Sequence, residues 1–316
     1  MRFLITGGAG FIGSNFIRYI FEQSQFIAPK VVVIDKLTYA GSLNNISSFL
    51  GELNFEFIHG DICNAELVKD LVADCDVIVH FAAESHVDRS IDSARQFIRT
   101  NVLGTEVLLN EVKNNPKVKF LLVSTDEVYG SIENGSWNEL CALKPNSPYS
   151  ASKASADLLA LAYRHTYSLD IMISRCCNNY GPSQFPEKLI PLFIMNLING
   201  KKLPIYGNGS NVREWIHVND HCRGLELIIK NGTPGEIYNI GTGMEISNLN
   251  LAMKLAKIFN FDEKCFSFVE DRLGHDKRYS LDFTKARVNL GYKPVVPFEE
   301  GLLATIDWYN KNHKII

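Results

Sequence analysis

The chain has 316 residues, of which 46% are hydrophobic and 21% are charged, a composition typical of soluble globular proteins. Its net charge of −3 and its pI near 6.3 give no electrostatic reason to expect a nucleic-acid partner or an anionic membrane surface. The length allows one large domain or two joined lobes. No apolar run approaches the length of a membrane span, and no cleavage site follows the N-terminal apolar stretch, so we expect a cytoplasmic protein.

The seven cysteines are scattered along the chain, and only Cys176 and Cys177 lie close together in sequence. No spacing resembles a zinc site or a disulfide framework. Reduced thiols, buried as small hydrophobic side chains, are the simplest interpretation. We therefore expect neither disulfide bonds nor a metal site.

The first half of the chain alternates between strand-like and helix-like segments. Short apolar, β-branched runs predict strands at residues 2–6, 31–35, 55–59, 76–81 and 118–125. Helix-like segments lie between them at 11–23, 65–72 and 94–114, followed by a helix at 147–167 and a strand at 170–176. Continuous apolar strands that alternate with helices are typical of a parallel sheet covered on both faces. The predicted fold is therefore α/β, a Rossmann-type doubly wound parallel sheet.

The regular alternation stops after residue 179, and residues 180–214 are richer in proline and glycine. We interpret residues 1–178 as one lobe and residues 179–316 as a smaller C-terminal α/β lobe. The boundary is approximate, and segments can cross between the lobes.

The turn after the first predicted strand carries Gly7, Gly10 and Gly13. Glycines at this spacing permit a tight turn, a close approach of the backbone to a pyrophosphate, and close packing of a helix on a strand. The phosphate would meet free N–H groups at the helix N-terminus. An ordinary strand–helix turn is the alternative, but the position at the start of the first βαβ unit favours a dinucleotide site.

The second predicted strand ends in Asp35, where a carboxylate can hold the ribose hydroxyls of a dinucleotide. A carboxylate there also repels the 2′-phosphate of NADP, so we predict NAD as the cofactor and residues 1–178 as its domain. Asp61 ends the following strand and is a candidate adenine contact. A strand-terminal aspartate in a turn is the alternative interpretation of Asp35.

Tyr149 and Lys153 are four residues apart in a predicted helix, which places both side chains on one helix face. A lysine ammonium beside the phenol favours the phenolate, which can then act as a base. The spacing alone is common by chance. Its position, one helix after a strand that ends in Ser124 and Thr125, makes it more specific.

Asp126 and Glu127 follow that strand directly and offer two adjacent carboxyl groups. Elimination of water needs two proton transfers beyond those of a simple oxidation and reduction, and two acids can supply them. Neighbouring like charges and burial would raise at least one pKa, so one carboxyl could start protonated. An exposed turn is the alternative interpretation of the pair.

Together these motifs resemble the extended branch of the short-chain dehydrogenase/reductase family, whose members bind NAD(P) and mostly remodel nucleotide sugars. Residues 124–130 closely resemble those of the sugar-nucleotide 4,6-dehydratases in that branch, and so do residues 82–90, 100–105, 178–182, 186–191, 211–215 and 271–279. The resemblance implies conversion of dTDP-glucose to dTDP-4-keto-6-deoxyglucose by a homodimer. Carbon 4 would be oxidised, water would leave across carbons 5 and 6, and carbon 6 would be reduced.

The resemblance also implies roles for individual residues, which fall into three groups. The catalytic residues are Thr125, Asp126, Glu127, Tyr149 and Lys153. The NAD-binding residues are Gly7, Gly10, Phe11, Ile12, Gly13, Asp35, Lys36, Leu37, Thr38, Asp61, Ile62, Phe81, Ala82, Ala83, Ser85, Thr100, Tyr149, Lys153 and Asn179. The substrate-binding residues are Ser85, Thr125, Asn178, Lys188, Leu189, Pro204, Ile205, Tyr206, Arg213, Asn248, Asp271, Arg272, His275 and Tyr279.

Physical chemistry supports part of the substrate group. Arg213 and Arg272 can neutralise diphosphate oxygens through charge-assisted bonds. Pro204, Ile205 and Tyr206 offer an apolar and aromatic wall on which a pyrimidine can pack.

Three alternatives remain open. A UDP-glucose 4,6-dehydratase fits the same motifs, because only the overall resemblance favours thymidine over uridine. A UDP-sugar 4-epimerase fits less well, since it has no evident use for Asp126 and Glu127. A catalytically silent NAD-binding regulator would tolerate loss of Tyr149, Lys153 and the acid pair, yet all are present.

Overall fold

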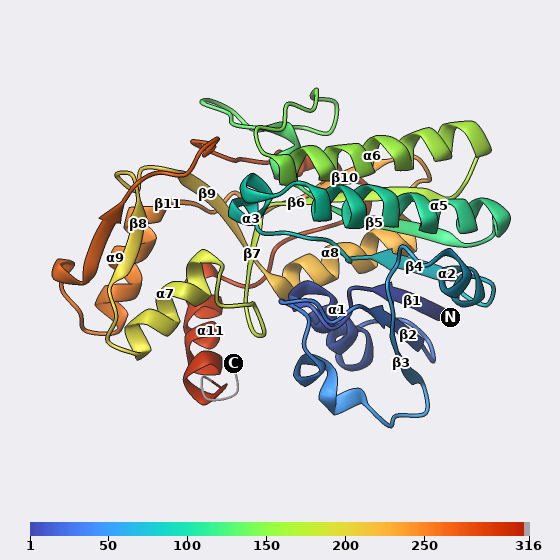
Figure 1. Ribbon diagram of the computed structural model, residues 1–316, viewed down its shortest axis with the longest axis horizontal. Coiled ribbons are helices and arrows are strands. Elements are labelled where there is room, and N and C mark those ends of the chain that lie inside the picture. Colours follow the sequence, from blue (N-terminus) through green and yellow to red (C-terminus); the bar gives the residue numbers. More distant parts are fainter. Residues whose placement is uncertain (313–316) are drawn as a thin grey trace.

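The computed structural model describes residues 1–312, and its main feature is a seven-stranded parallel sheet (Figure 1). The strand order is β10-β6-β5-β4-β1-β2-β3, and every neighbouring pair is parallel. The strands are β1 (Arg2–Thr6), β2 (Lys30–Asp35), β3 (Phe55–His59), β4 (Val77–His80), β5 (Lys119–Thr125), β6 (Ile171–Cys176) and β10 (Ile237–Ile240).

Helices cover both faces of this sheet, because the side chains of each strand alternate between two cores. Phe3 and Ile5 of β1 pack in one core, which also contains side chains from α1, α8 and α10. Leu4 packs in the other core with side chains from α2, α5 and α6. The helices are α1 (Phe11–Glu22), α2 (Ala65–Val72), α3 (Val87–Asp92), α5 (Gly104–Asn114), α6 (Pro148–Tyr167), α8 (Val218–Asn231) and α10 (Thr284–Leu290), with the 3₁₀ turn η1 (Leu43–Phe49). The predicted Rossmann-type doubly wound fold is confirmed.

The single helix predicted at 94–114 is interrupted. It consists of α4 (Arg95–Phe97), a π-helical turn η2 (Ile98–Leu103) and α5. Asn101 lies in that turn, and its side-chain amide accepts from Glu84 N at 2.8 Å and donates to Glu84 O at 3.0 Å and to Ser152 Oγ at 2.8 Å. The wider turn thus ties the loop after β4 to α6, and π-helical turns within helices are frequent at functional sites.

The smaller lobe has its own core and two short sheets. One sheet contains β7 (Asn178–Tyr180), β9 (Val212–His217) and β11 (Glu245–Ser247), and the other contains β8 (Leu203–Tyr206) and β12 (Phe266–Val269). Its helices are α7 (Leu189–Ile198), α9 (Asn248–Ile258) and α11 (Phe298–Asn312), with the 3₁₀ turn η4 (Glu263–Cys265). Phe193, Leu255 and Leu302 pack together in its core.

The chain returns to the large lobe after entering the small one. Strand β10 pairs with β6 at the edge of the main sheet, and Leu225 and Ile228 of α8 pack in the same core as Phe16 of α1. The two lobes are therefore not continuous in sequence, and the division at residue 178 holds only for the first pass of the chain. The last four residues of the proposed second lobe, 313–316, lie outside the described residues. Within residues 1–312, no helix combines the length and apolar character needed to cross a bilayer.

Two buried histidines predict how stability depends on pH. Burial lowers the pKa of His80 and of His221 to about 3 each. Below about pH 6.5 the unfolded chain takes up protons at these positions and the folded chain does not. The folded state therefore becomes less stable as the pH decreases. We expect the free energy of unfolding to fall by about 2 kcal/mol per histidine between pH 7 and pH 5.

Urea denaturation across this pH range provides the measurement. His80 bonds to Thr6 Oγ1 at 2.7 Å and to Thr105 Oγ1 at 3.0 Å, so an asparagine replacement keeps one polar contact without the titration. The slope of stability against pH should be smaller for His80→Asn than for the wild type. An equal slope would contradict the assignment.

Candidate active site

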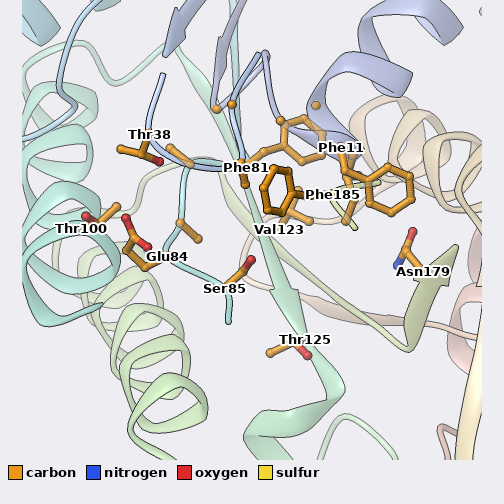
Figure 2. Close-up of a pocket in the computed structure, with 18 of the residues that line it drawn as sticks. Phe11, Thr38, Phe81, Glu84, Ser85, Thr100, Val123, Thr125, Asn179 and Phe185 are labelled. Atoms are coloured by element: carbon orange, nitrogen blue, oxygen red, sulfur yellow. The ribbon is translucent and has the colours of Figure 1, made fainter. Parts of the chain in front are cut away.

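A pocket lies at the carboxyl ends of the central strands, where the turns after β1, β2, β4, β5 and β6 converge. Figure 2 shows Phe11, Phe81 and Phe185 among the residues that line this pocket, with Thr38 and Thr100 on the left of the view and Asn179 on the right. Ligands bind in this place in open parallel sheets, because the strand ends and helix N-termini leave a crevice there.

Most residues predicted from the sequence line this one pocket. From the NAD group they are Gly7, Gly10, Phe11, Ile12, Gly13, Asp35, Lys36, Thr38, Asp61, Ile62, Phe81, Ala82, Ala83, Ser85, Thr100, Tyr149, Lys153 and Asn179, and from the other groups Thr125, Asp126, Glu127, Asn178 and Lys188. The predicted residues that do not line it are Leu37, Leu189, Pro204, Ile205, Tyr206, Arg213, Asn248, Asp271, Arg272, His275 and Tyr279.

The glycine turn has no room for side chains. Gly7 has φ +70°, and a Cβ there would lie 2.6 Å from Ala82 N. A Cβ on Gly13 would lie 2.4 Å from Gly7 O. Helix α1 begins after Gly10, which supplies no side-chain cap to the first N–H groups of the helix. A tight turn that leads into an uncapped helix N-terminus fits a pyrophosphate.

Gly13→Ala should therefore weaken NAD binding at least about tenfold, because the added methyl group forces the turn apart. Equilibrium binding of NAD to the cofactor-free protein measures this. Gly224→Ala is the matched control. Gly224 lies on α8, away from the pocket, and a Cβ there would lie 3.0 Å from the Ile240 side chain. The control should change stability and leave NAD affinity unaltered, and equal losses in both variants would contradict a specific role for the turn.

The end of β2 presents an acid that the backbone holds in place. Asp35 Oδ2 accepts from Ala9 N at 2.9 Å, and Oδ1 accepts from Leu37 N at 2.8 Å. Burial raises the pKa of Asp35, and these two bonds oppose that effect. Leu37 has φ +50°, and its backbone N–H donates to Asp35 Oδ1, whereas Leu37 does not line the pocket.

Asp61 gathers two cations at the same end of the pocket. Its Oδ2 accepts from Lys36 Nζ at 2.9 Å and from Arg99 Nη2 at 3.3 Å. Burial raises the pKa of Asp61, but bonds from Cys63 N, Lys36 and Arg99 outweigh burial and lower the pKa to about 2. Asp61 is therefore an anion at neutral pH.

The two adjacent acids begin the 3₁₀ turn η3 (Asp126–Tyr129), directly after β5. Asp126 is 2% exposed, and its Oδ2 is buried without a hydrogen-bond partner among the described residues. Burial, followed by the charges of Glu127 and Glu214, raises the pKa of Asp126 well above its usual value. Asp126 is thus suited to carry a proton at neutral pH, as the sequence suggested.

Glu127 lies in a different electrostatic setting. Burial raises the pKa of Glu127 above its usual value, and the charges of Arg272, Lys188 and Arg213 oppose this rise only in part. The two neighbouring acids therefore differ in their surroundings. Carboxylate charges favour the protonated form of Asp126, whereas three cations favour the carboxylate form of Glu127.

Tyr149 and Lys153 both lie in α6 and line the pocket. Burial, followed by Glu127 and Cys176, raises the pKa of Tyr149 well above its usual value. This direction is opposite to the lowering by Lys153 that the sequence suggested, because the phenol is buried beside acids. Lys153 Nζ donates to Val123 O at 2.8 Å, which fixes its position at the end of β5.

The substrate-group residues outside the pocket fall into two sets. Leu189 and Ile205 pack in the small-lobe core, with Pro204 beside Ile205 on β8. Polar residues form a linked cluster instead. Tyr206 Oη bonds to Asp88 at 3.3 Å, Arg272 lies 3.9 Å from Asp88, and His275 bonds to Asp271 at 2.6 Å.

Arg213 of β9 contacts the same chain segment that carries Asp271, Arg272 and His275. Its guanidinium lies over the Tyr279 ring at 4.3 Å and donates to Asp276 O at 2.8 Å. Arg272 Nε and Asn248 Oδ1 are buried without partners among residues 1–312. A buried guanidinium nitrogen and a buried amide oxygen without partners fit a ligand that carries both an anionic group and a hydrogen-bond donor.

The pocket also contains residues that sequence reasoning missed. Glu84, Gln184, Phe185 and Glu187 line it, as do Ile34, Ala40, Gly41, Gly60, Val123, Ser124, Cys176 and Cys177. Glu84 and Glu187 lie within segments already matched to the dehydratases, so their motifs offered a signal. Gln184 and Phe185 lie on the connection between β7 and α7, where composition gives none.

Comparisons with known proteins show the family to which the chain belongs. The family model described as GDP-mannose 4,6 dehydratase matches residues 4–305. A dTDP-glucose 4,6-dehydratase from Streptomyces antibioticus is 53% identical over 99% of this chain and 93% of its own length. The low-salt glycan biosynthesis protein Agl12 from Haloferax volcanii is also 53% identical, over 98% of each chain.

A solved structure is similarly close. The dTDP-glucose 4,6-dehydratase DesIV from Streptomyces venezuelae, with NAD and TYD bound, superimposes with a TM-score of 0.98 at 51% identity. The match covers 100% of this chain and 98% of DesIV. The chain therefore belongs to the GDP-mannose 4,6 dehydratase family, and its predicted resemblance to the sugar-nucleotide 4,6-dehydratases of the extended short-chain dehydrogenase/reductase family is confirmed.

Proposed function

We propose that this chain is an NAD-dependent dTDP-glucose 4,6-dehydratase, a hydro-lyase that forms dTDP-4-keto-6-deoxyglucose. The observation that carries the proposal is the presence of Asp126 and Glu127 in one pocket with Tyr149 and Lys153. Oxidation and reduction alone need the tyrosine, whereas loss of water needs an acid and a base besides. The relatives named dTDP-glucose 4,6-dehydratase and the NAD in DesIV support the same activity.

The cofactor and substrate occupy different parts of the site in this proposal. Gly7, Gly10 and Gly13 hold the pyrophosphate of NAD, Asp35 the adenosine ribose, and Asp61 the adenine. The arginines Arg213 and Arg272 hold the substrate diphosphate, with the other substrate-group residues around the sugar and base. A bound nicotinamide ring supplies a positive charge beside Tyr149 and the acceptor, later the donor, of hydride.

The protein groups then move protons in turn. Tyr149 takes the proton of the 4-hydroxyl during oxidation of carbon 4, and Lys153 stabilises the phenolate that precedes this step. The new ketone acidifies the carbon 5 proton, which Glu127 removes. Asp126 protonates the departing 6-hydroxyl, and the two leave as water.

The cycle closes without a net change in the protein. Glu127 returns its proton to carbon 5 as carbon 6 is reduced. A proton then passes from Tyr149 to Asp126, which restores both starting states. Charge effects already connect these groups, since Glu127 and Asp126 both raise the pKa of Tyr149.

Incubation of the purified chain with dTDP-glucose tests the function. We expect a product lighter by one water that carries a ketone at carbon 4. An isomer of unchanged mass would indicate an epimerase, and no reaction would indicate an NAD-binding protein without this activity.

Parallel kinetics with UDP-glucose test the choice of base. We propose thymidine, whose 5-methyl group is worth about 1–3 kcal/mol in an apolar pocket, or about 10- to 200-fold in kcat/KM. An equal or larger kcat/KM for UDP-glucose would reject this choice.

We further propose a cytoplasmic homodimer, the assembly that the family resemblance implies. The mass measured by equilibrium ultracentrifugation should be twice that of one chain, which is 35.5 kDa. A mass equal to one chain would reject the dimer.

A further inference from the structure

An ion pair lies fully buried beneath the candidate active site. Arg175 Nε of β6 lies 2.9 Å from Asp157 Oδ2 of α6, and the two side chains are 2% and 0% exposed. Removing two charges from water is costly, and apolar replacements of such pairs are often neutral or stabilising. Stability therefore does not explain why charges occupy this position.

The ion pair lies next in the helix to Lys153, a side chain that we assign to catalysis. Lys153 lies one helical turn before Asp157 in α6, on the same helix face, and is 5% exposed. Burial lowers the pKa of Lys153, and Asp157 is the largest effect in the opposite direction, followed by Cys176. Burial raises the pKa of Asp157 as well, and the charge of Arg175 is the largest effect that favours its carboxylate form. With Arg175 beside it, Asp157 is the main source of negative charge for the buried ammonium group.

The remaining groups that face Lys153 do not replace this charge. His80 on β4 is kept neutral by burial, and its low pKa also reflects the charge of Lys153. Tyr149, on the same helix, has a pKa raised by burial, so it is a neutral phenol until Lys153 and a bound nicotinamide favour its phenolate. Cys176 on β6 has a pKa raised by burial to about 12, so it too is neutral.

Arg175 holds Asp157 in a rigid setting. It lies opposite Ser124 in the register of β5 and β6, and its guanidinium is 4.7 Å from the centre of the Tyr129 ring. Tyr129 ends η3, the turn that begins with Asp126, and its hydroxyl donates to Asn239 Oδ1 at 2.9 Å. The carboxylate is therefore anchored to the segment that carries the elimination acids.

We propose that Asp157, held by Arg175, is a positioning residue that keeps Lys153 protonated beside Tyr149 during oxidation of carbon 4. The proposal rests on the proposed function, because it assigns Lys153 a role in that step. No contact between Asp157 and the substrate is involved. Its effect passes through Lys153.

The test isolates the oxidation step. In a Glu127→Gln background, where elimination is blocked, rapid mixing with dTDP-glucose gives the rate of reduction of bound NAD at each pH. The variant Asp157→Leu/Arg175→Met removes both charges with apolar groups of similar size. We expect a thermal midpoint at or above that of the parent. The rate of NAD reduction should decline at high pH as Lys153 loses its proton, and we call this decline the alkaline limb. In the charge-free variant the midpoint of this limb should move to lower pH by about one unit, which lowers the rate at pH values above the midpoint about tenfold.

Two matched variants separate charge from structure. Arg175→Met leaves the charge of Asp157 near Lys153, so it should lose stability without moving the limb to lower pH. Glu226→Gln removes another buried carboxylate, which lies on helix α8 outside the pocket. Glu226 Oε2 accepts from Tyr19 Oη of α1 at 2.6 Å. This variant should also lose stability and leave the limb in place.

Each outcome decides the proposal. An unmoved limb in the charge-free variant would show a structural role only and overturn it. If that variant does not fold, Asp157→Asn should move the limb and Asp157→Glu should restore it, and identical limbs in both would again overturn the proposal. Failure of the wild type to form the 4-keto product would reject the proposed function itself, whereas product formation with an unmoved limb rejects this inference alone.

Discussion

Tyr149→Phe should abolish the first chemical step, with no reduced NAD and no product formed from dTDP-glucose. The phenol is the group that takes the 4-hydroxyl proton, and phenylalanine retains the ring and its packing against Phe97. General bases contribute about 10²- to 10⁴-fold, and we expect a loss of kcat/KM of at least about 10³-fold. The absorbance of reduced nicotinamide after rapid mixing measures the step directly.

Tyr163→Phe is the control on the same helix. Tyr163 Oη bonds to Glu106 at 3.2 Å outside the pocket, so this variant should keep its activity within about twofold. A Tyr149→Phe enzyme that still reduces bound NAD at a rate close to that of the wild type would show that another group is the base.

Glu127→Gln should stop the reaction at a later point. Oxidation of carbon 4 still proceeds, so reduced NAD accumulates on the enzyme, but the carbon 5 proton is not removed. We expect product formation to fall about 10²- to 10⁴-fold. Exchange of the carbon 5 proton with deuterium from solvent, followed by mass spectrometry, measures the missing step. Exchange at the wild-type rate would remove Glu127 from the role of base.

Asp126→Asn supplies the matched comparison at the adjacent position. The amide keeps the size of the acid and cannot protonate the 6-hydroxyl. Exchange at carbon 5 should therefore continue while loss of water slows. Equal effects of both substitutions on exchange would contradict the division of labour between the two acids.

Both acids have raised pKa values, and the charges around them differ. Burial first, and then the charge of Glu127, keep the pKa of Asp126 high, so Asp126 loses its proton only as pH rises through that value. Elimination should accordingly decline at high pH in the wild type. In Asp126→Asn the residual elimination rate should show no decline at high pH. A decline that persists in this variant would show that another group causes it.

Local patterns in the sequence were sufficient for much of this site. Gly7 and Gly13 must be glycine because of the tight turn in which they lie, and Tyr149 and Lys153 share a face because a helix repeats every 3.6 residues. The acids follow a buried strand directly, and the ends of parallel strands meet at one edge of the sheet. Such features depend on neighbours in sequence, so they can be predicted without coordinates.

Contacts between distant segments could not be predicted in this way. The return of β10 to the main sheet depends on pairing with β6, more than sixty residues earlier, and no local pattern encodes that partner. The Asp157–Arg175 pair and the gathering of Lys36 and Arg99 around Asp61 likewise join separate elements. The pKa of Tyr149 depends on burial and on acids from another segment, which is why its direction differed from the expectation. Sequence alone determined which chemical groups are present and which strand ends carry them. The tertiary structure decided how deeply these groups are buried and which charges face them. The reason is that burial and Coulomb interactions act through space and not along the chain.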